Sequence, residues 1–110
     1  MKARIPGGMD KGGMMKRIQQ MQEDMERVQA EVEASSYSAS AGGGAVEAVV
    51  SGKHEVQSIR IDPDVVDPDD VEMLQDMIIV AINEAIRKAS EAMDKGIEAA
   101  KGGLSIPGLM

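Results

Sequence analysis

Residues 45–64 read AVEAVVSGKHEVQSIRIDPD, and this stretch decides the fold. Its first part, Ala45–Val50, is rich in β-branched and small apolar side chains, which are typical of a strand. Its last part, His54–Asp62, alternates polar with apolar residues, although less strictly. The three residues between them, Ser-Gly-Lys at 51–53, have the length of a hairpin connection. The stretch therefore predicts two antiparallel strands that end at an Asp-Pro turn.

A third strand is expected immediately before this hairpin. Serines alternate with Tyr37, Ala39 and Ala41, and a period of two places successive side chains on opposite faces of a strand. Three consecutive glycines, residues 42–44, then favour a turn. The sequence thus predicts a three-stranded antiparallel meander that runs from about Tyr37 to Asp62.

The segment from Met14 to about Ala34 has the periodicity of an amphipathic helix. Its apolar residues have the heptad spacing of a helix that packs along one other helix. They are Met14, Ile18, Met21, Met25, Val28 and Val32. Two interpretations stay open. Either the stripe forms a two-helix seam, at least in part between two chains, or the helix lies on the sheet of its own chain.

A second long helix is expected from the Asp-Pro loop to about Ala100. Asp67 suits the cap of this helix and Pro68 its first position. Its pattern is apolar all round over residues 77–82, so this part must be covered on more than one side. The sheet covers one side, and a second subunit is expected to cover the other. The residues expected in that interface are Met77, Ile78, Ile79 and Ile82.

Together these elements predict an α+β fold with the order α-β-β-β-α. Residues 14–100 are expected to form one domain that carries both dimerisation and binding. Residues 1–13 are expected to be a flexible, basic, Gly-rich arm, and residues 101–110 a disordered tail.

The composition favours a homodimer. The 110 residues include one aromatic side chain, Tyr37, and ten Met. Methionine fills gaps in a core but specifies its shape poorly, and a core of this size is small. A chain with a poor core of its own buries apolar surface against a partner, and a two-fold dimer is the commonest arrangement.

The net charge of −7 disfavours nucleic acid as a partner, but the charge is unevenly distributed. Residues 1–17 hold five basic groups and one acidic group, a balance of +4, whereas the other 93 residues have a balance of −11. A two-fold dimer would therefore have cationic ends on an anionic body. Such a particle would bind a polyanion only through local contacts.

Several kinds of chemistry are disfavoured by the residue types. With one His and no Cys, a chain cannot build a Cys/His nucleophile pair or a His-based metal cluster. His54 is expected to be an exposed strand residue, and the aspartates of residues 62–70 fit helix capping better than a calcium loop. We expect no enzyme activity, no catalytic residue, metal or cofactor, and no small-molecule substrate. No apolar run reaches the about 20 residues that span a bilayer, so no membrane association is expected.

Basic groups at the start of the first helix suit contacts with phosphate. Lys11, Lys16 and Arg17 lie beside glycine-rich backbone, whose amides can approach a phosphate closely. The basic residues of the second helix, Arg87, Lys88 and Lys95, are interpreted mainly as solvated charges. Because recognition of single strands usually stacks bases on aromatic rings, a chain with one Tyr favours double-stranded DNA.

The order of several segments also resembles a known family. The segments are the Gln- and Met-rich residues 14–25, the hairpin at 44–56, the strand end and Asp-Pro turn at 59–64, the helical residues 72–76 and 81–85, and Pro107-Gly108 in the tail. Over roughly residues 12–100, their order and spacing resemble the YbaB/EbfC family of nucleoid-associated DNA-binding proteins.

The resemblance implies a tweezer-like homodimer that binds double-stranded DNA at the nucleoid, in the cytoplasm, and regulates genes or protects DNA. It also implies that the DNA contacts come from helical parts of the projecting arms, here Lys16, Arg17 and Arg27. Lys2 and Arg4 belong to an extension that is longer than the usual start of the family. The alternative is a non-enzymatic adaptor whose Met-rich helical surface docks another protein.

Overall fold

The computed structural model describes residues 6–102, and the side chains of residues 12–102. Its elements are α1 (Pro6–Ala34), β1 (Ser36–Ala41), β2 (Val46–Ser51), β3 (Val56–Ile61), the short 3-10 helix η1 (Pro63–Val65) and α2 (Val71–Lys101). This is the order α-β-β-β-α, so the α+β fold predicted from the sequence is confirmed.

The three strands form an antiparallel sheet in the order β1-β2-β3. Ala39 lies opposite Ala48, and Ala41 lies opposite Val46. Along its other edge β2 pairs with β3, where Ala48 lies opposite Ile59. Because side chains alternate along a strand, the apolar residues share one face of the sheet and the serines of β1 lie on the other.

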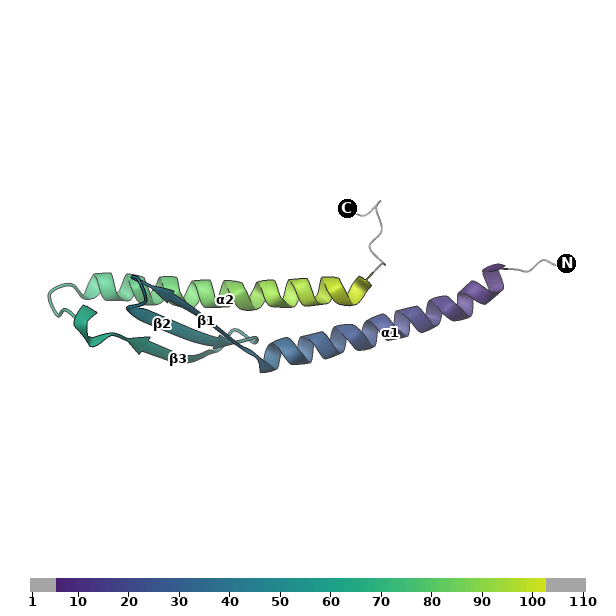
Figure 1. Cartoon of the computed structure of the whole chain (residues 1–110), viewed down its shortest axis with the longest axis horizontal. Helices are drawn as coiled ribbons and strands as arrows, with labels where there is room; N and C mark the ends of the chain where they lie inside the picture. Colours follow the sequence, from purple (N-terminus) through teal and green to yellow (C-terminus); the bar gives the residue numbers. More distant parts are fainter. Residues whose placement is uncertain (1–5, 103–110) are drawn as a thin grey trace.

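Small residues set the distance between α2 and this apolar face. Ala81, Ala85 and Ala89 are fully buried, and their spacing of four residues places them on one side of the helix. They pack against β1 and β2, where Val46 and Val50 are the largest fully buried side chains. Figure 1 shows the first part of α2 lying along the sheet. The core is therefore a single thin layer of alanines and valines.

Helix α1 packs mainly on α2 and meets the end of the sheet only near its own C-terminal end. Figure 1 shows the two helices side by side beyond the end of the sheet. Met25 and Ile97 line one groove between them, and a Cβ atom added at Gly96 would overlap the Val28 side chain. The C-terminal part of the heptad stripe therefore forms a seam within one chain.

The first helix begins at Pro6, eight residues earlier than the sequence indicated. The segment 6–13, predicted as part of a flexible arm, is thus helical. Glycine costs a helix about 1 kcal/mol per residue relative to alanine, but extending an existing helix is far easier than starting one. Residues 1–5 and 103–110, which hold the rest of the predicted arm and most of the predicted tail, lie outside the described residues.

The second helix begins three residues later than predicted, because Asp70 and not Asp67 caps it. The Asp70 carboxylate accepts a hydrogen bond of 3.2 Å from the Met73 amide. Asp67 instead accepts a hydrogen bond of 2.9 Å from the Asp69 amide, within the turn that precedes α2. Asp62 caps η1 in the same way. A capping role is thus confirmed for Asp62 and Asp70, whereas the predicted cap, Asp67, does not cap a helix.

The molecule is elongated, measuring 85 × 26 × 15 Å. Its radius of gyration is 22.2 Å, whereas a compact chain of this length would have about 13 Å. The sheet and the first part of α2 form a body, and α1 with the last part of α2 forms a two-helix arm. At the end of this arm, α1 projects beyond α2 (Figure 1). A helix that leaves the body in this way can reach a large partner.

Candidate nucleic-acid interface

Positive charge collects on the projecting part of α1, residues 11–22, which we call the α1 tip. The tip holds Lys11, Lys16 and Arg17 and no carboxylate, whereas residues 23–33 hold five acidic groups and one basic group. The cationic segment thus lies in the part of α1 that projects away from the acidic body (Figure 1). The residues of α1 before it, 6–10, add one charge, that of Asp10. This separation answers the objection that an anionic chain repels a polyanion.

Lys16 and Arg17 are exposed. Among the side chains of residues 12–102, neither takes part in an ion pair. The other arginines of that range all have carboxylate partners: Arg27 with Asp24 (2.8 Å), Arg60 with Glu47 (2.6 Å) and Arg87 with Glu91 (2.5 Å) and Glu84. The charges of Lys16 and Arg17 are therefore not neutralised by a described side chain, whereas the arginines farther along the chain are paired with carboxylates.

Arg27 is the predicted contact residue with a competing partner. Its guanidinium donates a hydrogen bond to Asp24, and this bond, helped by one from Gln20, lowers the pKa of the Asp24 carboxyl. Asp24 is thus negatively charged at neutral pH. A DNA phosphate would have to replace that carboxylate at Arg27, whereas Lys16 and Arg17 need no such exchange.

Helix geometry places Lys16 and Arg27 on the side of α1 that faces away from α2. Lys16 is two positions from both Met14 and Ile18, which is about 200° around a helix, so it lies opposite the apolar stripe. Arg27 follows Lys16 by eleven residues, close to three full turns, and shares its face about 16 Å along the axis. Arg17 is turned by about 100° to one flank. Lys11 belongs to α1, but its side chain lies outside the described residues.

Two basic residues of α2, Arg87 and Lys88, make contacts that the sequence did not indicate. Lys88 donates a hydrogen bond of 2.8 Å to the Ser38 carbonyl of β1, which ties the edge of the sheet to the helix. The pKa of Arg87 is raised by its hydrogen bond with Glu84 and by the charges of Glu84 and Glu91. Because Lys88 and Ser38 are 50 residues apart, no local pattern could have revealed their contact.

The four predicted interface residues do not share one side of α2. Met77, Ile78 and Ile82 are half-buried against the core, whereas Ile79 is 55 % exposed. Met77 and Ile79 differ by two positions, so they lie on opposite flanks of the helix. Around the helix Ile82 lies about 60° from Ile79 and about 140° from Met77. Ile79 and Ile82 therefore share a flank, although Ile82 packs on the same core cluster as Met77.

The flank of α2 that carries Ile79 has no charged residue over more than six turns. Its members are Gln75, Ile79, Ile82, Asn83, Ile86, Ser90, Met93 and Ile97, and we call it the neutral flank. It faces the β3 side of the sheet, since Ser90 lies 3.2 Å from His54 in the turn before β3. Ile59 and Ile61 of β3 pack on the same core cluster as Ile82. Ile86 was not among the residues predicted for the interface, although its spacing from Ile79 and Ile82 places it on the same flank.

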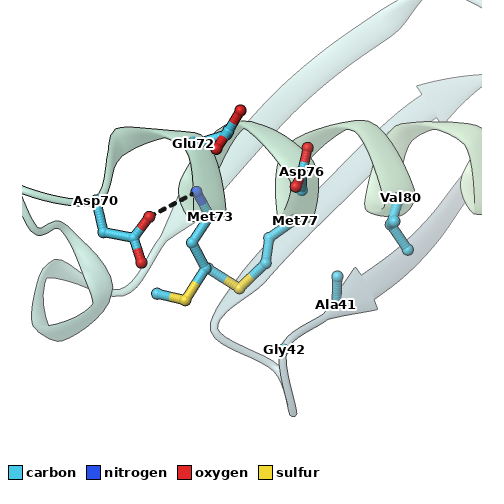
Figure 2. Close-up of a pocket in the computed structure, with 8 residues that line it drawn as sticks. All are labelled: Ala41, Gly42, Asp70, Glu72, Met73, Asp76, Met77 and Val80. Carbon is cyan, nitrogen blue, oxygen red and sulfur yellow. Dashed lines mark hydrogen bonds between the residues drawn. The ribbon is translucent and has the colours of Figure 1, made fainter.

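A groove of about 430 Å³ lies on the opposite flank, beside the turn after β1. Figure 2 shows the Met73 and Met77 side chains leaving α2 on the side where Ala41 and Gly42 lie, with Met77 bent toward Met73. The charged residues that line the groove are all acidic, namely Asp70, Glu72 and Asp76. A groove lined in this way repels phosphate, so it does not extend the basic surface of the α1 tip.

The described part of the chain offers neither a metal site nor a membrane-spanning helix. Within it no three His, Cys, Asp or Glu side chains gather in a way that could hold a metal ion. None of its helices combines the length and the apolar character that crossing a membrane requires.

The fold and its charges define an elongated α+β protein whose projecting helix carries two exposed basic side chains, Lys16 and Arg17, that make no ion pair with another described side chain. The chain belongs to the YbaB/EbfC DNA-binding family, whose model matches residues 7–104. The resemblance inferred from the sequence is thereby confirmed.

Relatives and a solved structure agree with this assignment. A nucleoid-associated protein of Alkaliphilus metalliredigens is 54 % identical over 103 residues, which cover 94 % of this chain and 90 % of the relative. A nucleoid-associated protein of Acetivibrio thermocellus is 52 % identical over 110 residues, with 98 % and 97 % covered. The crystal structure of an uncharacterized Helicobacter pylori protein matches with a TM-score of 0.57 at 19 % identity. It covers 71 % of this chain and 90 % of that one, which supports the fold alone.

Proposed function

We propose that this chain binds double-stranded DNA as a homodimer, through phosphate contacts made by its two α1 tips. Membership of a DNA-binding family supports DNA as the partner. The names of its relatives support a place at the nucleoid and a role in nucleoid organisation or gene regulation. The observation that carries the proposal is the exposure of Lys16 and Arg17, without ion pairs among the described side chains, on a segment free of carboxylates.

The charge distribution determines how DNA would be held. Phosphates would meet the α1 tips, while the acidic body, with the aspartates of residues 62–70, would stay away from the duplex. Contacts of this kind position a protein on the DNA backbone and carry no base information. We therefore expect binding that depends strongly on salt and weakly on DNA sequence.

The second copy would cover the neutral flank of α2. This flank is the charge-free side of a helix whose core is thin, and Ile79 leaves more than half of its surface in water. The β1 edge of the sheet is tied to Lys88, which favours the β3 side for the partner. In the proposed tweezer-like dimer, the bodies join at this flank and the two arms project outward.

The test is a fluorescence anisotropy titration of duplex DNA at two salt concentrations. For four to six phosphate contacts per dimer, log affinity should fall with log salt with a slope of about −4 to −5. In the Lys16→Glu, Arg17→Glu variant, affinity should fall strongly and the slope should approach zero, because up to four of these contacts are lost per dimer. The helix content should not change.

A matched control carries the same change of charge elsewhere. Lys53 and Lys95 are exposed and lie away from the α1 tip, so the Lys53→Glu, Lys95→Glu variant should retain most of the affinity. Equal losses in the two variants would show that only net charge matters. Undiminished affinity in the α1-tip variant would remove the proposed site.

The second candidate is a non-enzymatic adaptor that docks another protein. The groove with Met73 and Met77 favours it (Figure 2), because methionines adapt to varied partners. This function would give no DNA binding at low salt, or binding that ignores salt. The same titration therefore separates the two functions.

A further inference from the structure

The apolar stripe of α1 continues beyond the point where α2 ends. Val32, at its C-terminal end, is buried with 8 % exposure, and Val28 packs against Gly96 of α2. At the other end Met14 is 60 % exposed and Ile18 is 41 % exposed. One continuous stripe is therefore covered at one end and open at the α1 tip.

The chain leaves α2 beside the start of the open part of the stripe. Gly96 contacts Val28 and Ile97 lies beside Met25, so the two helices run antiparallel. Each helix rises about 1.5 Å per residue. The end of α2 at Lys101 is thus about level with Met21.

The next segment of the chain has the composition and the length to cover that surface. Residues 103–110 read GLSIPGLM and contain four large apolar side chains and no charge. Eight residues span up to about 26 Å, whereas Met21 and Met14 are about 10 Å apart along the helix. Gly102 has a φ of 57°, a conformation that turns the chain away from the helix axis.

We propose that residues 103–110 dock on the apolar stripe of the α1 tip in the same chain. A tail attached next to its binding surface has a high effective concentration there, which favours the tail of the same chain over a second copy. The docked segment lies opposite Lys16, so it leaves that side chain open. The proposal concerns the stripe alone and does not rest on DNA binding.

Because the chain has no cysteine, one engineered pair can test the contact in the full-length protein. Under mild oxidation the Ile18→Cys, Ile106→Cys variant should form a disulfide within one chain. It should form at least about tenfold faster than in a control with Gln20→Cys and Ile106→Cys, since position 20 faces the opposite side of α1. Non-reducing denaturing electrophoresis separates bonds within and between chains.

Each outcome decides the proposal. A fast bond within the chain supports it. Bonds between chains would show that the stripe binds a second copy. Equal rates in the two variants would show that the tail does not select the stripe. Either result would overturn the proposal.

Amide exchange gives a second measurement. Exchange at residues 14–21 should be about tenfold faster in a chain truncated after Gly102, and unchanged exchange would contradict the docking.

Discussion

At the scale of single residues, glycines decide how closely the elements of this protein approach one another. Gly52, in the turn between β2 and β3, is buried, and its amide donates a hydrogen bond of 3.2 Å to the Ser35 carbonyl. A Cβ atom at this position would overlap the Val32 carbonyl oxygen and approach the Glu33 backbone. The turn therefore packs directly on the end of α1 and joins the body to the arm.

Gly52→Ala should destabilise the protein by about 1–3 kcal/mol, because the obstructing atoms belong to the backbone and cannot move aside cheaply. Urea unfolding followed by circular dichroism measures this loss. Gly13 is the matched control, since it is exposed in α1 with no neighbour within 4 Å. Gly13→Ala should stabilise the helix by about 0.5–1 kcal/mol. A normal unfolding midpoint for Gly52→Ala would refute the close packing.

The backbone conformation of His54 could not be predicted from the alternation of polar and apolar residues. The alternation of residues 54–62 placed it in a strand, but it lies in the turn before β3 with a φ of 68°. Its expected exposure is confirmed. The left-handed conformation follows from the tight turn after β2, where the Ser51 carbonyl accepts a hydrogen bond of 2.9 Å from the His54 amide.

At the scale of the element, α2 performs two tasks with two parts of its length. Its first part presents Ala81, Ala85 and Ala89 to the sheet, and its last part presents Gly96 to α1. Small residues at both contacts allow the helix to lie close to each neighbour. The amphipathic pattern of α2 predicted a helix. The small size of its contacting residues sets the distance at which it packs on the sheet and on α1.

Replacing a buried alanine of α2 with a larger residue should separate the helix from the sheet. Ala85→Leu adds three carbon atoms to a site with no exposure and should cost about 1–3 kcal/mol. The same change at Ala99, which is exposed, should have little effect. Thermal unfolding of the two variants measures the difference. Equal stability would mean that the layer between α2 and the sheet can expand freely.

At the scale of the whole molecule, a thin core and a long arm leave much apolar surface in water. Ile79 and Val80 are each 55 % exposed, but they lie about 100° apart on α2. Ile79 belongs to the neutral flank, whereas Val80 lines the groove with the acidic residues. The proposed dimer buries Ile79 and leaves Val80 exposed.

This pair gives a direct test of the dimer. Ile79→Asp should shift the protein toward monomers, because a carboxylate buried in an apolar interface loses its hydration. Val80→Asp, which starts from equal exposure, should leave the dimer intact. Sedimentation equilibrium measures the mass of each variant. A monomeric wild-type protein, or equal dissociation of the two variants, would contradict the proposed interface.

The sequence by itself determined the order of the elements, because a period of two or of seven is written in neighbouring residues and needs no distant contact. It also determined the family and the basic character of the α1 tip. Only the tertiary structure decided that α1 packs on α2, that Lys88 ties β1, and that Met77 and Ile79 lie on different flanks. These three features depend on how the helices and strands are placed relative to one another. That placement is set by contacts between residues far apart in the chain.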